Sequence, residues 1–322
     1  MPQLAARRRA GHAWLRPIAL AAILALGALA PAAAAETESV RKVDVSGVER
    51  SYLLHLPRGA PDGKPLPLVV VLHGGGGSGA LVAAQTGFSA EADQEGFIVA
   101  YPDGSDRPRP LMSALGKPGL LTWNAGGCCG YAQQQDVDDV AFFRALVADV
   151  ERSHPIDRKR IYVAGHSNGG MMAYRIACEA SGTVAAIGVV SGVMVSAPCA
   201  PSGLVSVIDI HGTADANVPI GGGVGSKSIA RVSYPPVAQT IAFWAANDDC
   251  SPVPTSSRPL PGVSLDDYES CPSGLGIAYY RIEGGGHAWP GGKRVSMMLD
   301  KPSEVLQATP LIWAFFKAHP KS

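Results

Sequence analysis

A serine flanked by glycines is the first place in this chain where residue types and spacing indicate chemistry. Gly165-His166-Ser167-Asn168-Gly169 follows an apolar run and precedes a segment with helical spacing. A strand, a sharp turn and a helix, with a serine at the apex and glycine two residues to either side, are typical of a nucleophile elbow. The glycines are needed because a Cβ at either flank would collide with the neighbouring strand or helix. We therefore interpret Ser167 as a nucleophile, placed over a helix N-terminus that favours negative charge.

A second motif offers an acid. Asp215 ends His211-Gly212-Thr213-Ala214-Asp215, directly after an apolar strand and a glycine turn. An aspartate in that position can accept a histidine N–H and hold the ring in one tautomer. Asp209 lies inside the strand and is expected to point into a packed face. Asp248 and Asp249 end a predicted helix and are interpreted as solvated, so Asp215 is the preferred acid.

A third motif offers a base. His287 follows Gly284-Gly285-Gly286, where it packs against no predicted core face and caps no helix. His166, beside the serine, is expected to fix the elbow rather than take its proton. The order Ser167, Asp215, His287 along the chain is the order of an α/β-hydrolase triad. In that arrangement the serine attacks an acyl carbon, the histidine takes and returns its proton, and the aspartate steadies the imidazolium.

A run of glycines after a buried strand, His73-Gly74-Gly75-Gly76-Gly77, is interpreted as the oxyanion loop. Backbone N–H groups approach a substrate oxygen closely where no side chain intervenes, and Gly74 or Gly75 would act together with Asn168. His73 is expected to organise this loop beside the substrate. Gly74, Gly76 and Gly79 also match a dinucleotide fingerprint with Asp103 as the ribose acid, but that reading leaves Ser167 and His287 without roles. A phosphate-binding loop at 221–228 fails because Ser226 stands where glycine must precede Lys227.

The elements that must position these loops alternate between strand and helix. Apolar runs and helical periodicity predict a hairpin at 42–57, strands at 66–72, 97–101, 161–164, 185–190, 204–211 and 277–283, and helices at 80–95, 136–152, 168–177, 237–246 and 303–318. This alternation predicts an α/β fold, a doubly wound, mostly parallel sheet with helices on both faces in a single domain. Its site should lie beyond the carboxyl ends of the strands. The insertion at 104–135 and the segment after His287 bring Trp123, Tyr131 and Trp289 as candidate walls of a substrate pocket, with packing of the loop equally open for Trp123 and Tyr131.

The first 35 residues are predicted to be a targeting signal. Four arginines precede an apolar stretch at 18–30 and the small-residue site Ala33-Ala34-Ala35. This pattern predicts a cleavable signal peptide at 1–35 and a secreted or periplasmic location, with twin-arginine export as an alternative. The domain that carries the predicted triad is then 36–322. Of the 27 basic and 27 acidic residues, the signal removes four arginines and no acid. The remaining slight acidity implies neither nucleic acid nor an anionic membrane as a partner, and the sequence indicates no oligomeric state.

Six cysteines in an exported chain predict disulfides rather than metal ligands. Cys178 with Cys199, and Cys250 with Cys271, are the preferred pairs because each closes one local excursion. Cys128 and Cys129 are adjacent, and a vicinal bond, bridges elsewhere and free thiols all remain open.

Four motifs together carry a family resemblance: L-H-G-G-G-G-S-G, A-G-H-S-N-G-G-M-M, I-H-G-T-A-D-A-N-V-P and G-G-G-H-A-W-P-G-G. They resemble the esterases that include polyhydroxybutyrate depolymerases and feruloyl or acetylxylan esterases, over roughly 43–316. The resemblance implies an α/β-hydrolase fold, Ser167, Asp215 and His287 as the triad, and neither metal nor organic cofactor. It implies an ester substrate, either hydroxyacyl polyester or acyl groups on polysaccharide. A peptidase of the same fold and an inactive binding module are the alternative functions.

Overall fold

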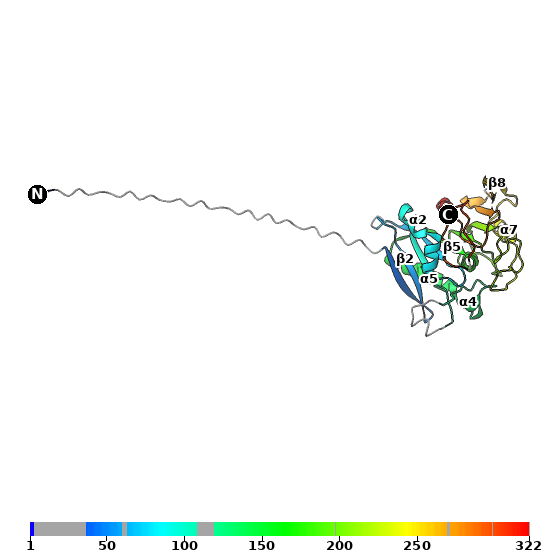
Figure 1. The fold of residues 1–322 in the computed structure, drawn as a ribbon, viewed down its shortest axis with the longest axis horizontal. Helices are drawn as coiled ribbons and strands as arrows, with labels where there is room; N and C mark the ends of the chain where they lie inside the picture. Colours follow the sequence, from blue (N-terminus) through cyan, green and yellow to red (C-terminus); the bar gives the residue numbers. More distant parts are fainter. Residues whose placement is uncertain are drawn as a thin grey trace. The chain divides into compact units, whose positions relative to one another are not determined.

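One mixed sheet organises the protein. The computed structural model describes residues 1–2, 37–59, 63–107, 119–196, 198–268, 271–297 and 299–321. Its strands run in the order β1-β2-β4-β3-β5-β6-β7-β10-β9-β8 across the sheet. Their bounds are β1 (Glu38–Val45), β2 (Val48–His55), β3 (Leu66–Leu72), β4 (Ile98–Pro102), β5 (Ile156–His166), β6 (Ala186–Val190), β7 (Ser206–Gly212), β8 (Thr255–Leu260), β9 (Val263–Asp267) and β10 (Ile277–Ile282). Figure 1 labels three of them, β2, β5 and β8.

The centre of the sheet is parallel and its margins are antiparallel. β4, β3, β5, β6, β7 and β10 pair in parallel in that order. β1 and β2 form a hairpin at one margin, and β8 and β9 form another at the opposite margin. Because the parallel strands share a direction, their carboxyl ends meet at one edge, where the loops after β3, β5, β7 and β10 lie.

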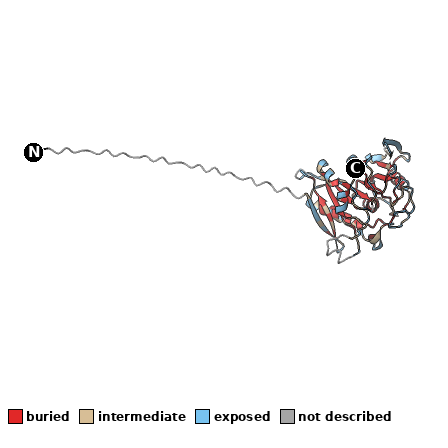
Figure 2. Cartoon of the chain, in the orientation of Figure 1, coloured by how far each residue is buried: buried red, intermediate tan, exposed pale blue. Residues whose placement is uncertain are grey.

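Helices cover both faces of this sheet. They are α1 (Gly79–Thr86), α2 (Phe88–Glu95), α4 (Gly130–Gln134), α5 (Asp139–Ser153), α6 (Asn168–Glu179), α7 (Val237–Asn247) and α8 (Ala308–Ala318). The buried side chains of α1, α2 and α8 belong to one core cluster, and those of α5, α6 and α7 to the other. Along β3, Val69 and Val71 face the first cluster while Leu68 and Val70 face the second. A strand apolar on both sides therefore separates two cores. Figure 2 shows buried residues along the strands inside the folded unit.

The predicted architecture is confirmed, with three corrections to its elements. The helix predicted at 80–95 is two helices, because Gly87 adopts a left-handed φ of 73° that ends α1. The last helix begins at Ala308 rather than near 303. The β8–β9 hairpin was not predicted, and all six residues of β8 are exposed, so it shows no apolar alternation.

The two predicted disulfides are present, Cys178–Cys199 and Cys250–Cys271, and Cys128 is bonded to Cys129. Residues 36–322 form one compact unit. The predicted signal peptide at 1–35 lies, apart from its first two residues, outside the part of the chain that the structure describes. Within the described part, no helix has the length and apolar character needed to cross a membrane.

Candidate active site

The turn between β5 and α6 places Ser167 at the carboxyl edge of the sheet. Ser167 has a φ of 56° and a ψ of −122°, and its N–H donates to the Val190 carbonyl of the neighbouring strand. A Cβ at Gly165 would overlap the backbone of Gly169, and a Cβ at Gly169 would overlap the carbonyl oxygens of Leu72 and His73. Both flanking glycines are thus required by close backbone approach, as the sequence motif predicts.

Three loops bring a serine, a histidine and an aspartate together. His287 Nε2 lies 2.9 Å from Ser167 Oγ, and His287 Nδ1 lies 2.7 Å from Asp215 Oδ2. His287 and Asp215 are buried, whereas Ser167 is half-buried. The His287 ring can therefore accept the serine proton on one nitrogen while its other N–H donates to the carboxylate.

Asp215 is held as a carboxylate by its surroundings. Its Oδ1 accepts the backbone N–H groups of Asn217 and Val218, each at 2.9 Å. Burial by itself raises the pKa of Asp215, but the hydrogen bond from His287 and the charges of His287 and His211 outweigh it and lower the pKa to about 2. The carboxylate therefore remains ionised near neutral pH.

Asp209, the rival acid, is buried in β7 and accepts the Tyr174 hydroxyl at 2.8 Å. Between it and Asp215 lies His211, which the sequence did not single out. The His211 ring nitrogens are 3.8 Å from Asp209 Oδ1 and 3.7 Å from Asp215 Oδ2, and Nε2 donates to the Val218 carbonyl. Burial lowers the pKa of His211, but the neighbouring Asp209 carboxylate reverses the direction and raises it. The charge of His211 is one of the causes that lower the pKa of Asp215.

The predicted oxyanion loop lies against the elbow. A Cβ at Gly74 would stand 3.4 Å from Ser167 Cβ, and a Cβ at Gly75 would stand 3.7 Å from Asn168 Cβ. The buried His73 ring donates from Nδ1 to the Gly74 carbonyl at 2.8 Å and accepts the Gly104 N–H on Nε2 at 2.9 Å. Burial lowers the pKa of His73 to about 4, so the ring is neutral. His73 organises the loop, and both of its nitrogens are bonded to backbone instead of facing a substrate.

Trp123 and Trp289 differ from their expected place on a pocket wall. Each is about 1% exposed. The Trp123 indole N–H donates to the His73 carbonyl, and its backbone N–H and carbonyl bond both ends of the Asn168 amide. The Trp289 indole N–H donates to Thr309 Oγ1. Trp123 therefore ties the 121–130 loop to the elbow, and Trp289 packs behind His166 at a ring distance of 6.4 Å.

His166 lies next to the triad without joining it. Its ring centre is 5.0 Å from that of His287, and Nδ1 faces Gln85 Nε2 at 3.4 Å. Burial and the charge of His287 lower the pKa of His166 to about 3. It is therefore a neutral packing residue of the elbow, in line with the role expected from its position in the motif.

The glycine loop does not offer a dinucleotide site. Asp103, the candidate ribose acid, already accepts the Gly79 N–H on Oδ1 and the Ser51 hydroxyl on Oδ2. The Gly76 N–H donates to Leu121 and the Gly77 N–H to Gly74, so neither points toward a phosphate. Among the described residues, no group of three or more histidine, cysteine, aspartate or glutamate side chains could hold a metal ion.

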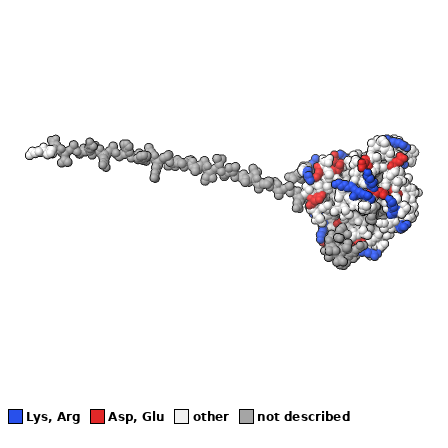
Figure 3. All heavy atoms as spheres, in the orientation of Figure 1, with Lys and Arg blue, Asp and Glu red and all other residues white. Residues whose placement is uncertain are grey.

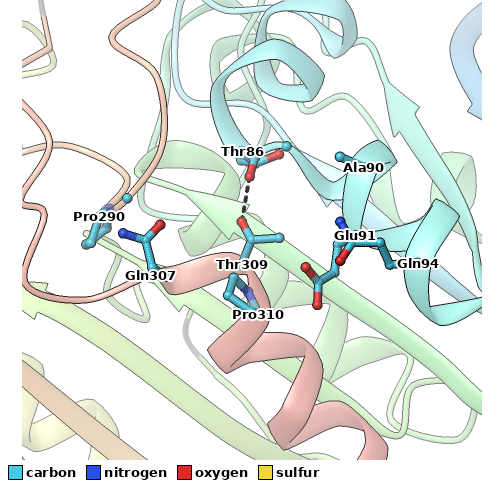
Figure 4. Close-up of a pocket in the computed structure, with 10 residues that line it drawn as sticks. Thr86, Ala90, Glu91, Gln94, Pro290, Gln307, Thr309 and Pro310 are labelled. Carbon is cyan, nitrogen blue, oxygen red and sulfur yellow. Dashed lines mark hydrogen bonds between the residues drawn. The ribbon is translucent and has the colours of Figure 1, made fainter.

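Two surface cavities lie apart from the triad. One of about 250 Å³ is bordered by α1, α2 and the start of α8, where Thr309 donates to the Thr86 carbonyl (Figure 4). The other, of about 330 Å³, is lined by Asn124, Arg175 and Glu179 among others. Neither is lined by Ser167, Asp215 or His287. The hydrogen bonds of the three loops, and not these two cavities, therefore mark the candidate site.

The chain is similar in sequence to known esterases. The model of the family described as "Esterase PHB depolymerase" matches residues 50–243, more than half of the chain. The chain belongs to this family. The chain is 34% identical over 275 residues to NocK of Nocardia uniformis subsp. tsuyamanensis, whose name places it among esterases, covering 80% of this chain and 75% of NocK. It is 28% identical to feruloyl esterase B of Piromyces equi over 76% of this chain and 44% of that protein.

Solved structures of other proteins share the fold of this chain. An acetyl xylan esterase from Aspergillus awamori superposes with a TM-score of 0.59 at 15% identity, covering 87% of this chain and 99% of the other. The predicted α/β-hydrolase fold is thereby confirmed. Membership in the family makes the chain a carboxylic ester hydrolase.

Proposed function

We propose that the protein is a serine esterase in which Ser167, His287 and Asp215 perform an acyl-enzyme mechanism. Ser167 Oγ attacks the acyl carbon while its proton passes to His287 Nε2. The N–H groups of Asn168 and of Gly74 or Gly75 then donate to the oxyanion. Collapse of the tetrahedral species expels the alcohol, which takes the proton back from His287. A water molecule repeats the sequence on the acyl-serine and releases the acid.

One observation carries this proposal. A contact of 2.9 Å joins Ser167 to His287, and a contact of 2.7 Å joins His287 to Asp215. The three residues lie on loops that follow three separate strands. Both distances fall within hydrogen-bonding reach, which a base and its orienting carboxylate require. Asp209 instead accepts a hydrogen bond from the Tyr174 hydroxyl, so the geometry favours Asp215 as the partner of His287.

The proposed substrates are esters with a short or phenolic acyl group. The family description names polyhydroxybutyrate depolymerases, and similar proteins carry the names feruloyl esterase and acetyl xylan esterase. We propose hydrolysis of hydroxyacyl polyester oligomers or of feruloyl or acetyl groups on polysaccharide. Figure 3 shows lysine, arginine and acidic side chains interspersed on the face in view, which fits a neutral substrate better than a polyanion.

We further propose that the protein acts outside the cytoplasm, after cleavage of residues 1–35. Three disulfides among the described residues support this location because such bonds persist in oxidising compartments. N-terminal sequencing of the exported protein is expected to begin at Glu36. A mature chain that retains the first 35 residues would contradict the proposal.

The mechanism is tested by replacing Ser167 with alanine. Ser167→Ala should lower kcat on p-nitrophenyl acetate by roughly 10⁴-fold or more, because the nucleophile is removed. Ser256→Ala, at an exposed serine of β8, is the matched control and should keep full turnover. Retention of wild-type turnover by Ser167→Ala would refute the mechanism. The wild-type enzyme is then assayed on hydroxybutyrate oligomers, methyl ferulate and acetylated xylan, and the highest kcat/KM identifies the acyl group.

A further inference from the structure

The histidine of the proposed triad is carried by a glycine-rich segment, in which the Ala288 N–H donates to the Gly286 carbonyl across the histidine at 3.0 Å. Three consecutive glycines precede it, and Gly284 adopts a left-handed φ of 66°. The Gly284 N–H donates to Thr213 Oγ1, and the Gly285 carbonyl accepts the Ala214 N–H. These bonds fix the glycines against the loop that carries Asp215. They do not fix the peptide groups of His287 itself.

Those peptide groups are held by Asp300. The His287 N–H donates to Asp300 Oδ2 at 2.9 Å, and the Asp300 N–H donates to the His287 carbonyl at 3.2 Å. One residue thus bonds both polar groups of the His287 backbone. The close approach depends on Gly286, because a Cβ there would stand 2.5 Å from Asp300 Oδ2 and 2.8 Å from Asp300 Cβ.

Lys227 extends this contact to the aspartate loop. Its Nζ lies 2.9 Å from Asp300 Oδ1, and its backbone N–H donates to the carbonyl of Ala216, the neighbour of Asp215. A Cβ at Gly225 would overlap the Asn217 carbonyl, so the 225–228 turn lies directly on this loop. Lys227 therefore connects the segments that carry the proposed acid and the proposed base.

We propose that Asp300 is a positioning residue that fixes the His287 backbone, and that Lys227 holds Asp300 in place. The proposal rests on the proposed function, since it assigns the reason why His287 can contact Ser167 and Asp215 at once. A misplacement of about 1 Å in such a constellation lowers the rate by about a hundredfold. The contacts of Asp300 with the His287 backbone and with Lys227 form a clasp. Partial loss of this clasp should therefore lower kcat while leaving substrate binding nearly unchanged.

The clasp also contributes charge next to the imidazole. The charged or titratable groups that face His287 are Asp215, Ser167, the neutral His166, His211 behind Asp215, and Asp300 with Lys227. The hydrogen bonds from Lys227 and from the His287 N–H lower the pKa of Asp300, so it is a carboxylate. Removing that negative charge takes away electrostatic stabilisation of the positive charge that forms on the ring during the reaction. Removing only the lysine leaves the negative charge unbalanced and has the opposite effect.

The test measures kcat and KM for p-nitrophenyl acetate against pH in four variants. Asp300→Ala should lower kcat about 10- to 100-fold with KM within about twofold. Asp300→Asn keeps an acceptor for the His287 N–H and should restore kcat to within about threefold of wild type. In both Asp300 variants, the fall of kcat on the acidic side of its pH profile (the acid limb) should move to lower pH. Lys227→Met should move it to higher pH, while Lys42→Met, which breaks the exposed pair with Glu49, should move nothing.

The outcomes separate positioning from folding. If Asp300→Ala is insoluble, Gly286→Ala displaces the same carboxylate and should show the same loss of kcat. A wild-type kcat in Asp300→Ala would overturn the proposal. Where that variant does not fold, a wild-type kcat in Gly286→Ala would do so. An acid limb that moves in neither Asp300→Asn nor Lys227→Met would also overturn it. If the wild-type protein cleaves no ester, the proposed function fails instead. The clasp is then measured by the rate at which a fluorophosphonate labels Ser167, which should fall in Asp300→Ala.

Discussion

At the scale of single residues, the serine at the elbow is held in a backbone conformation that L-residues rarely adopt. Ser167 combines a φ of 56° with a ψ of −122°, outside the common left-handed well. Such a conformation costs about 1–3 kcal/mol and persists only where the surroundings impose it. Here the Val190 carbonyl and the start of α6 fix both sides of the residue. The exposure of the hydroxyl therefore comes at the expense of stability.

This strain can be measured by comparing Ser167→Gly with Ser167→Ala. Both variants lack the hydroxyl and should be inactive. Because glycine adopts positive φ without a Cβ clash, Ser167→Gly should exceed Ser167→Ala in free energy of unfolding by about 1 kcal/mol. Chemical denaturation of the two variants under one set of conditions checks the difference. An alanine variant as stable as the glycine variant would show that the elbow stores no strain.

Residues that follow strand ends within short motifs were predictable, whereas residues that act from a distance were not. Ser167, Asp215 and His287 each stand where a strand pattern stops and a glycine follows or precedes. Asp300 lies 13 residues beyond His287 in an irregular segment, and no local pattern marks it. Trp123 and Trp289 were expected on a pocket wall because an aromatic residue in a loop has no visible packing partner in the sequence. The structure supplies those partners from other segments.

At the scale of elements, the packing of α6 against β3 and β5 depends on the absence of side chains at the elbow. A Cβ at Gly169 would meet the Leu72 and His73 carbonyls, which are backbone atoms of β3 and its loop and cannot rotate away. Gly169→Ala should therefore lower the free energy of unfolding by about 3 kcal/mol or more, or prevent folding. Gly182→Ala, at an exposed position with nothing within 4 Å of the new Cβ, should change it by less than about 1 kcal/mol.

Thermal and chemical unfolding of the two alanine variants checks this contrast. A Gly169→Ala protein as stable as Gly182→Ala would mean that α6 moves away from the sheet at little cost. In that event, close packing of α6 against the sheet would not be what holds Ser167 in place.

Elements with a buried face could be predicted from the sequence, and an element without one could not. β3 and β5 have long apolar runs because both sides of the parallel centre are covered. β8 exposes every residue and contains Pro259, which is tolerated because the strand lies at the edge of the sheet. A strand paired on one side only and solvated on both faces carries no periodic hydrophobic signal, so its backbone pairing could not be inferred.

At the scale of the whole molecule, the loops at the carboxyl edge are organised around two histidines that are buried without charge. His73 is 1% exposed and burial lowers its pKa to about 4; His166 is equally buried and its pKa is lowered to about 3. In the unfolded chain both would titrate near the ordinary value of about 6.5. Below that pH the unfolded state binds protons that the folded state excludes, so each histidine lowers the stability as the pH falls from about 6.5 to its folded pKa.

Asp248 acts in the opposite sense. The interpretation of this residue as solvated is wrong, because its side chain is fully buried at the end of α7. Burial raises its pKa to about 6, above its ordinary value of 3.8. Between about pH 3.8 and 6 the folded state holds a proton that the unfolded state has released, so this group adds stability at low pH, which is lost as the pH rises through about 6. The pH dependence of the wild type is therefore a sum of opposing contributions, and single-site variants are needed to separate them.

The decisive measurement is the difference in unfolding free energy between variant and wild type at several pH values. Replacing His166 with asparagine removes one proton-excluding group. The unfolding free energy of the variant relative to the wild type should therefore rise by about 1.4 kcal/mol for each unit by which the pH falls between roughly 6 and 4. Replacing Asp248 with asparagine should give the reverse slope between about 5.5 and 4. A constant offset in His166→Asn would mean that the ring takes up a proton in the folded state. Because His166 lies 5.0 Å from the ring of His287, that proton would place a second positive charge beside the base and disturb the same acid limb that Asp300 is expected to control.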